Sequence, residues 1–374
     1  MQGKLFPSWD ERKIGVASRL ILKAINTSTG ITLEKIEDEW RKTGDLGIVA
    51  ENLINKKKQI TLFSQQLSVQ KVFNNLRKLA ELEGTGTVDK KLQLIAELLT
   101  SSKPIEAKYI TRTLLEELRV GVGEGSLRDA IVWAFFGDKI GLKYCSDNKI
   151  DISSREEYNN YASIVQRAYD LTNDFSSVAE AAKSGLKELE DMELSVFRPL
   201  KVMLAIKVKD IKEGFERCGK PADIEYKLDG FRIQVHKQGN KIKLFTRRLE
   251  DVTLQFPEVI EYVKKNVKGD SFILDSEAAG FNPKTGKYFP FQHISQRIRR
   301  KYDIAEMAQK FPVELNVFDI LYYDGKNLIK EDFQKRRELI EKIITNNPKK
   351  IQIVTNLITE DEKEVERFYK SSLS

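Results

Sequence analysis

The stretch EYKLDGFRIQVHK, Glu225 to Lys237, carries a lysine two residues before an Asp-Gly pair, in a segment with the alternation of a β-strand. Residues two apart in a strand point to the same face of a sheet. Glu225, Lys227 and Asp229 are therefore expected on one face, whereas Tyr226 points the other way, toward a core. Two interpretations of the polar face stay open here: a solvated surface, or a site in which the Asp-Gly pair positions the lysine for chemistry.

The segments around this stretch are short, rich in β-branched and aromatic residues, and bounded by turns. VHKQGNKIKLF predicts a hairpin about Gly239, and Arg232, Gln234 and His236 continue the polar face along its first strand. SFILDSEAAGF and VELNVFDILYYDG predict further strands, and LQFPEVIEYVKKNV and KEDFQKRRELIEKIITNN have helical spacing. Residues 204–374 are therefore predicted to form an α+β domain.

The first half of the chain has a different character, because its apolar residues recur at helical spacing. VQKVFNNLRKLAELEG and KKLQLIAELLTSSKP are examples, and NDFSSVAEAAKSGLKELEDM adds a helix for which Asp174 is a plausible N-cap. Nothing in this half alternates convincingly with period two. Residues 1–203 are therefore predicted to form an all-α domain, which makes the chain a multidomain protein.

Composition limits the function classes. The net charge of +7 and the pI of about 9.0 suggest a polyanionic partner, although many proteins are mildly basic. No apolar run approaches the roughly 18 residues that cross a bilayer, so no membrane partner is expected. The two cysteines, Cys145 and Cys218, lie far apart and fit a reducing cytoplasm. With two histidines, they do not make a zinc site.

A lysine in such a site can act as a nucleophile. Its ammonium form has no lone pair, and neighbouring cations or a bound metal favour the free amine. Arg232 and Arg247 are candidates for such cations, and they would also hold a phosphate. The amine of Lys227 could then attack phosphorus and retain a nucleotide as a phosphoramidate.

The motifs around Lys227 resemble a known family. EYKLDGFR resembles the nucleotidyl-lysine motif K-x-D-G of the ATP-dependent DNA ligases, whose superfamily includes RNA ligases and mRNA capping enzymes. FTRRLEDVT, FILDSEAAGF and ELNVFDILYYDG resemble the next motifs of that family in order, with Arg247, Glu277 and Phe318 at its motif positions. The acidic motif reads Asp275-Ser276-Glu277, where the family commonly has glycine before the glutamate.

The resemblance implies roles for these residues. Lys227 would take AMP from ATP, and Glu225 would recognise adenine or its surroundings. Phe318 would stack on adenine, unless it is a core aromatic of a strand. Arg232 would contact ribose and phosphates. Two further roles follow: Arg247 would also contact ribose or phosphate, and Glu277 would hold ribose or Mg²⁺, unless it is a buried structural glutamate.

The first half resembles the DNA-binding domain of archaeal and eukaryotic replicative-type DNA ligases, the archaeal type more closely. TGDLGIVAE and EAKYITRTLLEELRVGVGEGSLRDAI carry this resemblance. Glycines before a helix let backbone N–H groups approach phosphate, so this segment would grip the DNA backbone. The alternative is a glycine-rich helix connector. The candidate DNA contacts are Arg112, Arg119, Gly121, Gly123 and Arg128.

A second basic segment, FQHISQRIRRKY, spreads its cations over more than one helix face, so only some of them could touch DNA. These cations are Arg297, Arg299, Arg300 and Lys301.

The resemblance also implies partners and a setting. We expect a monomer that binds nicked duplex DNA during replication, repair and recombination, in the cytoplasm of an archaeal cell near the nucleoid. A sliding clamp is a common partner of such ligases, but no clamp-binding motif is identified here.

The chain ends at EVERFYKSSLS, whereas the family continues with an E-G-x-x-x-K motif and an OB-fold domain. We therefore expect an incomplete adenylation domain and a clipped DNA-binding domain, without full ligase activity. Two alternatives stay open: another nucleotidyltransferase, such as an RNA ligase or a capping enzyme, and a module that only binds DNA. The long helical first half disfavours the former.

Overall fold

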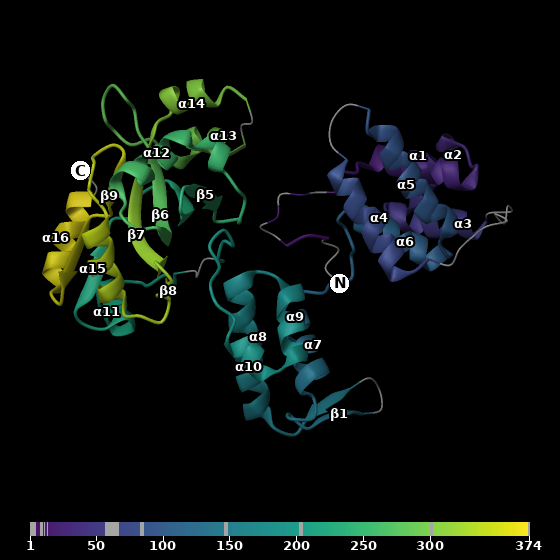
Figure 1. Ribbon diagram of the computed structural model, residues 1–374, viewed down its shortest axis with the longest axis horizontal. Helices are drawn as coiled ribbons and strands as arrows, with labels where there is room; N and C mark the ends of the chain where they lie inside the picture. The colour runs from purple at the N-terminus through teal and green to yellow at the C-terminus, as the bar shows by residue number, and fades with distance from the viewer. Residues whose placement is uncertain are drawn as a thin grey trace. The chain divides into compact units, whose positions relative to one another are not determined.

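The chain divides into two compact units, Met1–Trp133 and Ala134–Ser374 (Figure 1). The computed structural model describes residues 5–7, 10, 12, 14–56, 67–82, 86–145, 149–201, 205–299 and 302–372. The predicted domain boundary at residues 203/204 falls at a gap in this description and stays a prediction. No helix in the described part is long and apolar enough to cross a membrane.

The first unit is helical, as predicted. Ile21, Ile25 and Leu98 are completely buried between helices whose opposite faces are polar. Local signals end and begin these helices: Gly30 ends the first helix in a left-handed conformation, and the side chain of Asp45 caps the third. The helices are α1 (Ser18–Thr29), α2 (Leu33–Thr43), α3 (Leu46–Asn55), α4 (Val69–Glu81), α5 (Val88–Ser101) and α6 (Pro104–Leu114), and α7 (Glu124–Phe136) begins in this unit.

The second unit opens with a small hairpin and a further group of helices. Asp174 caps the second of these helices by accepting a hydrogen bond from the N–H of Ser176, 2.9 Å away, which confirms the predicted N-cap. The all-α label for residues 1–203 is wrong because of the hairpin. Its strands have only three residues each, too short for a pattern of period two to emerge. The elements are β1 (Leu142–Tyr144), β2 (Ile150–Ile152), α8 (Arg155–Thr172), α9 (Phe175–Ser184) and α10 (Leu186–Glu190).

The rest of the second unit is an α+β fold, as predicted. Its larger sheet has the order β5-β4-β6-β7-β8, with β9 parallel to β7, and β10 pairs with β3 in a separate ribbon. The predicted hairpin about Gly239 joins β4 and β5. The strands are β3 (Ala222–Glu225), β4 (Phe231–Gln238), β5 (Lys241–Thr246), β6 (Ser271–Gly280), β7 (Val313–Tyr323), β8 (Lys326–Asn327), β9 (Ile351–Ile353) and β10 (Asn356–Thr359). The helices are α11 (Ile211–Cys218), the 3₁₀ helix η2 (Thr253–Gln255), α12 (Pro257–Asn266), α13 (Phe291–Arg299), α14 (Ile304–Lys310), α15 (Phe333–Ile343) and α16 (Glu362–Ser372).

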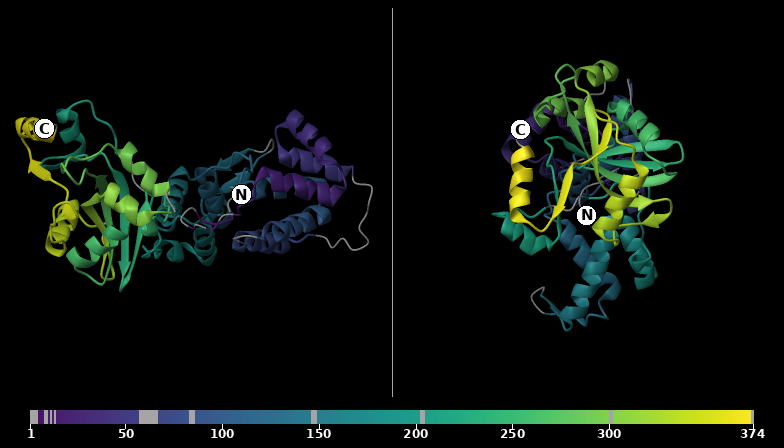
Figure 2. Two further views of the ribbon diagram at one scale, coloured as in Figure 1. Left: turned by 90° about the horizontal axis from the view of Figure 1, so that it is seen from above. Right: turned by 90° about the vertical axis from the view of Figure 1, so that its left-hand side faces the viewer.

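One face of the larger sheet packs on α12 and α15 and forms the main core (Figures 1 and 2). Ile233 and Leu274 are fully buried in that core, together with Val259 of α12 and Ile340 of α15. Because side chains alternate along a strand, the polar residues of β4 and β6 emerge on the opposite face. The polar residues of the two strands therefore meet on this second face.

Part of this polar face is covered by the segment before the sheet. The side-chain amide of Gln234 exchanges two hydrogen bonds, both 2.9 Å, with the backbone N–H and C=O of Leu200. The N–H of Phe197 donates to Nδ1 of His236 at 3.0 Å, and His236 is completely buried. The predicted polar face is therefore a buried contact at Gln234 and His236. The alternation of side chains correctly predicted which residues of β4 share this face. It could not predict that the face is covered, because the covering segment around Leu200 lies far from β4 in the sequence.

The burial of His236 predicts a pH dependence of stability. Burial lowers the pKa of His236 to about 3, against a smaller opposing effect of Asp251. The folded protein holds the imidazole in its neutral form. The contribution of His236 to the free energy of unfolding is therefore complete above pH 6.5 and is lost as the pH falls toward 3. The free energy of unfolding should fall by up to about 1.4 kcal/mol per pH unit in this range through His236 alone.

Urea unfolding between about pH 7.5 and about pH 4.5 tests this expectation. The variant His236→Asn keeps an acceptor for Phe197 but does not titrate, and it should have the shallower pH dependence. The variant His293→Asn, at an exposed histidine, should keep the wild-type slope. Equal slopes for the wild type and His236→Asn would contradict the prediction.

Candidate functional site

Lys227 is exposed and lies in the irregular link between β3 and β4, two residues beyond the end of β3. The prediction that it lies on a strand is wrong, because pairing with β10 ends at Glu225. Asp229 does not follow the strand alternation either. Its carboxylate accepts a hydrogen bond from the backbone N–H of Phe291 at 3.2 Å, which ties the link to the start of α13.

Gly230 is the last residue of the link, and its backbone packs closely against the backbone of β6. A Cβ at this position would lie 2.3 Å from the carbonyl oxygen of Ala278, far inside contact distance. The N–H of Gly230 also forms a hydrogen bond with the Glu277 carboxylate, which partly opposes the rise in the pKa of Glu277 caused by burial. The glycine of the K-x-D-G motif is thus required by close approach of backbone to backbone. It brings the link of Lys227 next to Glu277.

Glu277 lies on β6 opposite Arg232 of β4. Burial raises the pKa of Glu277 to about 7, against the opposing charges of Lys227 and Arg232. The carboxylate form therefore depends on nearby positive charge. The structure brings these three predicted site residues together at one end of the β4/β6 pair.

Arg232 is held in place by a residue that the sequence prediction did not include. Its guanidinium pairs with the carboxylate of Asp275, with Nε 2.7 Å from Oδ1. Asp275 is almost fully buried, and burial raises its pKa although the Arg232 ion pair opposes this. The guanidinium of Arg232 also lies 5.4 Å from the ring centroid of Phe318. A charged arginine fixed beside an aromatic ring suits a nucleotide site.

A β-bulge brings Phe318 to this face. In the pairing of β6 with β7, Asp275 faces Asp319 and Ser276 faces Val317, so Phe318 is the extra residue. Val317 and Ile320 both lie in the core although they are three residues apart. Phe318 is half-buried on β7 and lies beside Arg232, and its stacking on adenine stays a prediction.

Asp319, the neighbour of Phe318, is held by α15. Its carboxylate pairs with Arg336 through two hydrogen bonds of 2.8 and 3.0 Å. Burial is the main cause of the raised pKa values of Asp275 and Glu225, and the negative charge of Asp319 adds to it. Asp319 and Arg336 therefore extend the polar network of the site. Asp319 lies in the motif ELNVFDILYYDG but was not predicted as a site residue, and no motif or spacing pointed to Arg336.

Glu225 lies at the end of β3, and its carboxylate is 3.0 Å from the guanidinium of Arg337 on α15. Burial raises the pKa of Glu225 to about 7; Asp223 adds to this, whereas Arg337 opposes it. Arg337 is buried and also donates to the carbonyl of Val354 at 2.8 Å. It is a second partner that the sequence prediction missed, because it lies 112 residues from Glu225.

Arg247 follows the end of β5 and is exposed. Within the described part of the chain, no hydrogen bond or ion pair joins it to the other predicted site residues. Its predicted contact with ribose or phosphate stays a prediction.

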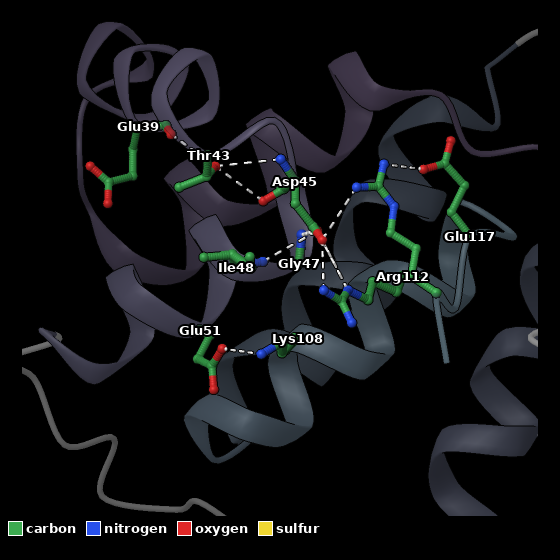
Figure 3. Close-up of polar contacts among 10 residues, drawn as sticks. Glu39, Thr43, Asp45, Gly47, Ile48, Glu51, Lys108, Arg112 and Glu117 are labelled. Carbon is green, nitrogen blue, oxygen red and sulfur yellow. Dashed lines mark hydrogen bonds and ion pairs between the residues drawn. The ribbon is translucent and has the colours of Figure 1, made fainter. Parts of the chain in front are cut away.

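Arg112, predicted to contact DNA, has a partner inside the first unit (Figure 3). Its guanidinium lies 2.7 Å from the carboxylate of Asp45, and the two side chains are 12% and 7% exposed. Burial would raise the pKa of Asp45, but hydrogen bonds from Arg112 and the N–H of Gly47 hold it below its ordinary value. Arg112 therefore joins α6 to the start of α3, and its contact with DNA stays a prediction.

The other candidate DNA contacts lie after α6. Arg119 is half exposed and pairs with Glu117 at 2.8 Å, and Arg128 of α7 pairs with Asp129 at 2.7 Å. Gly121 has a left-handed conformation with φ of 66°, and nothing lies within 4 Å of the Cβ position at Gly121 or Gly123. These glycines are open to approach, but the DNA role of the segment is untested.

The ion pair of Asp45 and Arg112 should stabilise the first unit. Asp45→Ala removes the cap of α3 and leaves the buried Arg112 without its close partner, so the free energy of unfolding should fall by about 3 kcal/mol. Chemical denaturation would measure this loss. Glu51→Ala is a matched control, because Glu51 pairs with Lys108 at 2.8 Å in a more exposed setting (Figure 3) and should cost less than about 1 kcal/mol. Equal losses would contradict the prediction.

The basic segment at α13 is only partly described. Arg297 is 1% exposed, and its guanidinium donates to Glu258 at 2.6 Å and to the carbonyls of Phe311 and Gln255. Arg297 is therefore not among the cations of this segment that could touch DNA, because it ties α13 to α12 and η2. The side chain of Arg299 and residues 300 and 301 lie outside the described residues.

Known proteins match both units. Residues 1–132 match the family described as "DNA ligase N terminus", and residues 202–374 match the family described as "ATP dependent DNA ligase domain". A DNA ligase from Nanoarchaeum equitans is 43% identical over 100% of this chain and 62% of its own length. DNA ligases from Thermococcus onnurineus and Methanopyrus kandleri are each 39% identical, over 99% and 100% of the chain and 62% and 63% of their own lengths.

The chain thus spans a little under two thirds of the length of the curated relatives that it matches. The relatives match along the whole chain, so the resemblance is not limited to the motifs around Lys227. The predicted family is confirmed: the chain belongs to the ATP-dependent DNA ligases.

Proposed function

We propose that Lys227 accepts AMP from ATP as the first step of DNA ligation. The observation that carries this proposal is the meeting of an exposed lysine, a half-buried carboxyl group and a fixed arginine at the end of β4 and β6. Lys227, Glu277 and Arg232 form this group, and Phe318 offers an aromatic face beside it.

In this step the neutral amine of Lys227 attacks the α-phosphorus of ATP. A P–N bond forms, the bond from the α-phosphorus to the bridging oxygen breaks, and pyrophosphate leaves with the electron pair. The amine releases its proton to solvent. Arg232, held by Asp275, would stabilise the charge on the phosphoryl oxygens. Phe318 would stack on adenine, and Glu225 would accept hydrogen bonds near the base.

A divalent cation, Mg²⁺, fits the chemistry of Glu277. Burial disfavours its ionised carboxylate, and a divalent charge nearby would compensate. Among the described residues, no group of three or more acidic, histidine or cysteine side chains could hold a metal by itself. Mg²⁺ commonly binds through one or two carboxylates and substrate phosphates, and its charge offsets that of the triphosphate.

The wider activity is also a proposal. AMP would pass from Lys227 to the 5′-phosphate at a nick, and the 3′-hydroxyl would then attack that phosphate and release AMP. The net charge of +7 supports nicked duplex DNA as the polyanionic partner. A sliding clamp, a monomeric state and a place near the nucleoid rest on the family alone.

Intact mass measurement after incubation with ATP and Mg²⁺ tests the proposed step. We expect a gain of one AMP with ATP and none with GTP. A gain only with GTP would favour a capping-type enzyme, and no gain with either nucleotide would overturn the proposal. Binding of nicked duplex DNA without any AMP gain would instead support a DNA-binding module.

A further inference from the structure

Tyr226, the residue before Lys227, is fastened to α16 near the end of the described chain. Its ring lies 4.6 Å from the ring of Phe368, with 31° between the ring planes. Its hydroxyl is 2.8 Å from that of Ser371, and the Ser371 hydroxyl donates to the carbonyl of Phe368 at 2.7 Å. Ser371 can therefore accept the hydrogen bond of Tyr226. One aromatic contact and one hydrogen bond thus join the link of the nucleophile to a helix about 140 residues away.

The same helix is anchored independently of Tyr226. Val365 of α16 lies in a small buried cluster with Phe215 of α11 and Ala222 of β3. The Tyr226 side chain therefore meets a helix that already has a fixed place against the ribbon of β3 and β10. The N–H of Tyr226 also donates to the carbonyl of Thr355 at 3.1 Å.

Apart from the backbone bond of Tyr226 to Thr355, the three residues from Tyr226 to Leu228 lie outside the strand pairs. On the far side of Lys227, Asp229 is tied to α13 and Gly230 is pressed on β6. On the N-terminal side of Lys227, the side chain of Tyr226 holds the link against α16. Lys227 is exposed between these two anchors, so the orientation of its backbone depends on them.

We propose that Tyr226 is a positioning residue for Lys227, and that it transmits the position of α16 to the attacking amine. This inference rests on the proposed function of Lys227. The hydrogen bond between the hydroxyls of Tyr226 and Ser371 and the contact of the Tyr226 ring with Phe368 together hold the backbone before Lys227 against α16. Loss of this tie leaves ATP able to bind but places the amine less often in line with the α-phosphorus.

The test is single-turnover attachment of AMP to the full chain, at saturating ATP and Mg²⁺ and across a range of ATP concentrations. Tyr226→Phe and Ser371→Ala should each lower the rate constant at saturating ATP by about tenfold, because small displacements of a reacting group are costly. The ATP concentration for half-maximal rate and the thermal unfolding midpoint should stay at the wild-type values. The double variant should be no slower than either single variant, because both remove the same hydrogen bond.

Tyr369→Phe is the matched control, since Tyr369 is on the same helix and 61% exposed, and it should keep the wild-type rate. A wild-type rate for Tyr226→Phe would overturn the inference. So would a slower rate that comes entirely from weaker ATP binding or from unfolding.

Amide hydrogen exchange separates this inference from the proposed function. Exchange in the segment 226–230 should be faster in Tyr226→Phe than in the wild type, with no nucleotide present. If the wild type gains no AMP, the proposed function fails, and the exchange rates still decide whether α16 holds the link. Unchanged exchange in Tyr226→Phe would overturn the inference.

Discussion

Lys227→Ala should lower the attachment of AMP by at least about 10³-fold, because it removes the attacking atom itself. The free energy of unfolding should change by less than about 0.5 kcal/mol, because the side chain is exposed and makes no hydrogen bond or ion pair in the described part of the chain. Intact mass and chemical denaturation would measure the two effects. A loss of activity with unchanged stability is the result expected of a nucleophile.

Two variants serve as controls for this prediction. Lys227→Arg keeps the positive charge but cannot supply a neutral amine, so it should be as inactive as the alanine variant. Lys268→Ala removes another exposed lysine of the same unit and should attach AMP at the wild-type rate. A full gain of one AMP by Lys227→Ala would place the nucleophile on another residue.

Gly230→Ala should have the second largest effect. The new methyl group would lie 2.3 Å from the carbonyl oxygen of Ala278 and 3.1 Å from Cγ of Glu277. The backbone of β6 is held by strands on both sides, so the link that carries Lys227 must move instead. We expect about a 10²-fold loss of AMP attachment and a loss of about 2 kcal/mol in the free energy of unfolding.

Gly214→Ala is the matched control for that change. Gly214 lies in α11 of the same unit, where the nearest atom to a new Cβ is 3.9 Å away, an ordinary contact. Alanine favours a helix over glycine, so this variant should be slightly more stable than the wild type. Similar behaviour of the two alanine variants would show that close approach at Gly230 is unimportant.

The sequence was informative where the signal is local. The hairpin about Gly239 and the N-cap at Asp174 depend on residues that are close together along the chain, and the structure confirms both. The family was also predictable, because the order of short motifs does not require knowledge of the fold. The hairpin of β1 and β2 was missed because three-residue strands carry too little pattern.

The supporting residues of the candidate site were not predictable in the same way. Arg232 pairs with Asp275 across 43 residues, and Glu225 pairs with Arg337 across 112. A single chain gives no sign of which carboxylate an arginine will meet, because charge pairs carry no positional signature. The β-bulge at Phe318 could not be predicted from the sequence either, since it arises from the pairing of β6 with β7.

By itself, the sequence determined that Arg232, Gln234 and His236 share one face of a strand, and it predicted Lys227 as the nucleotidyl-lysine through the resemblance of its motif. Only the tertiary structure decided what covers that face. At Gln234 and His236 the segment around Leu200 buries it, whereas Arg232 stays beside Glu277 and Phe318. The physical reason is that alternation along a strand fixes the direction of a side chain, whereas its environment depends on chain segments that fold onto it from elsewhere.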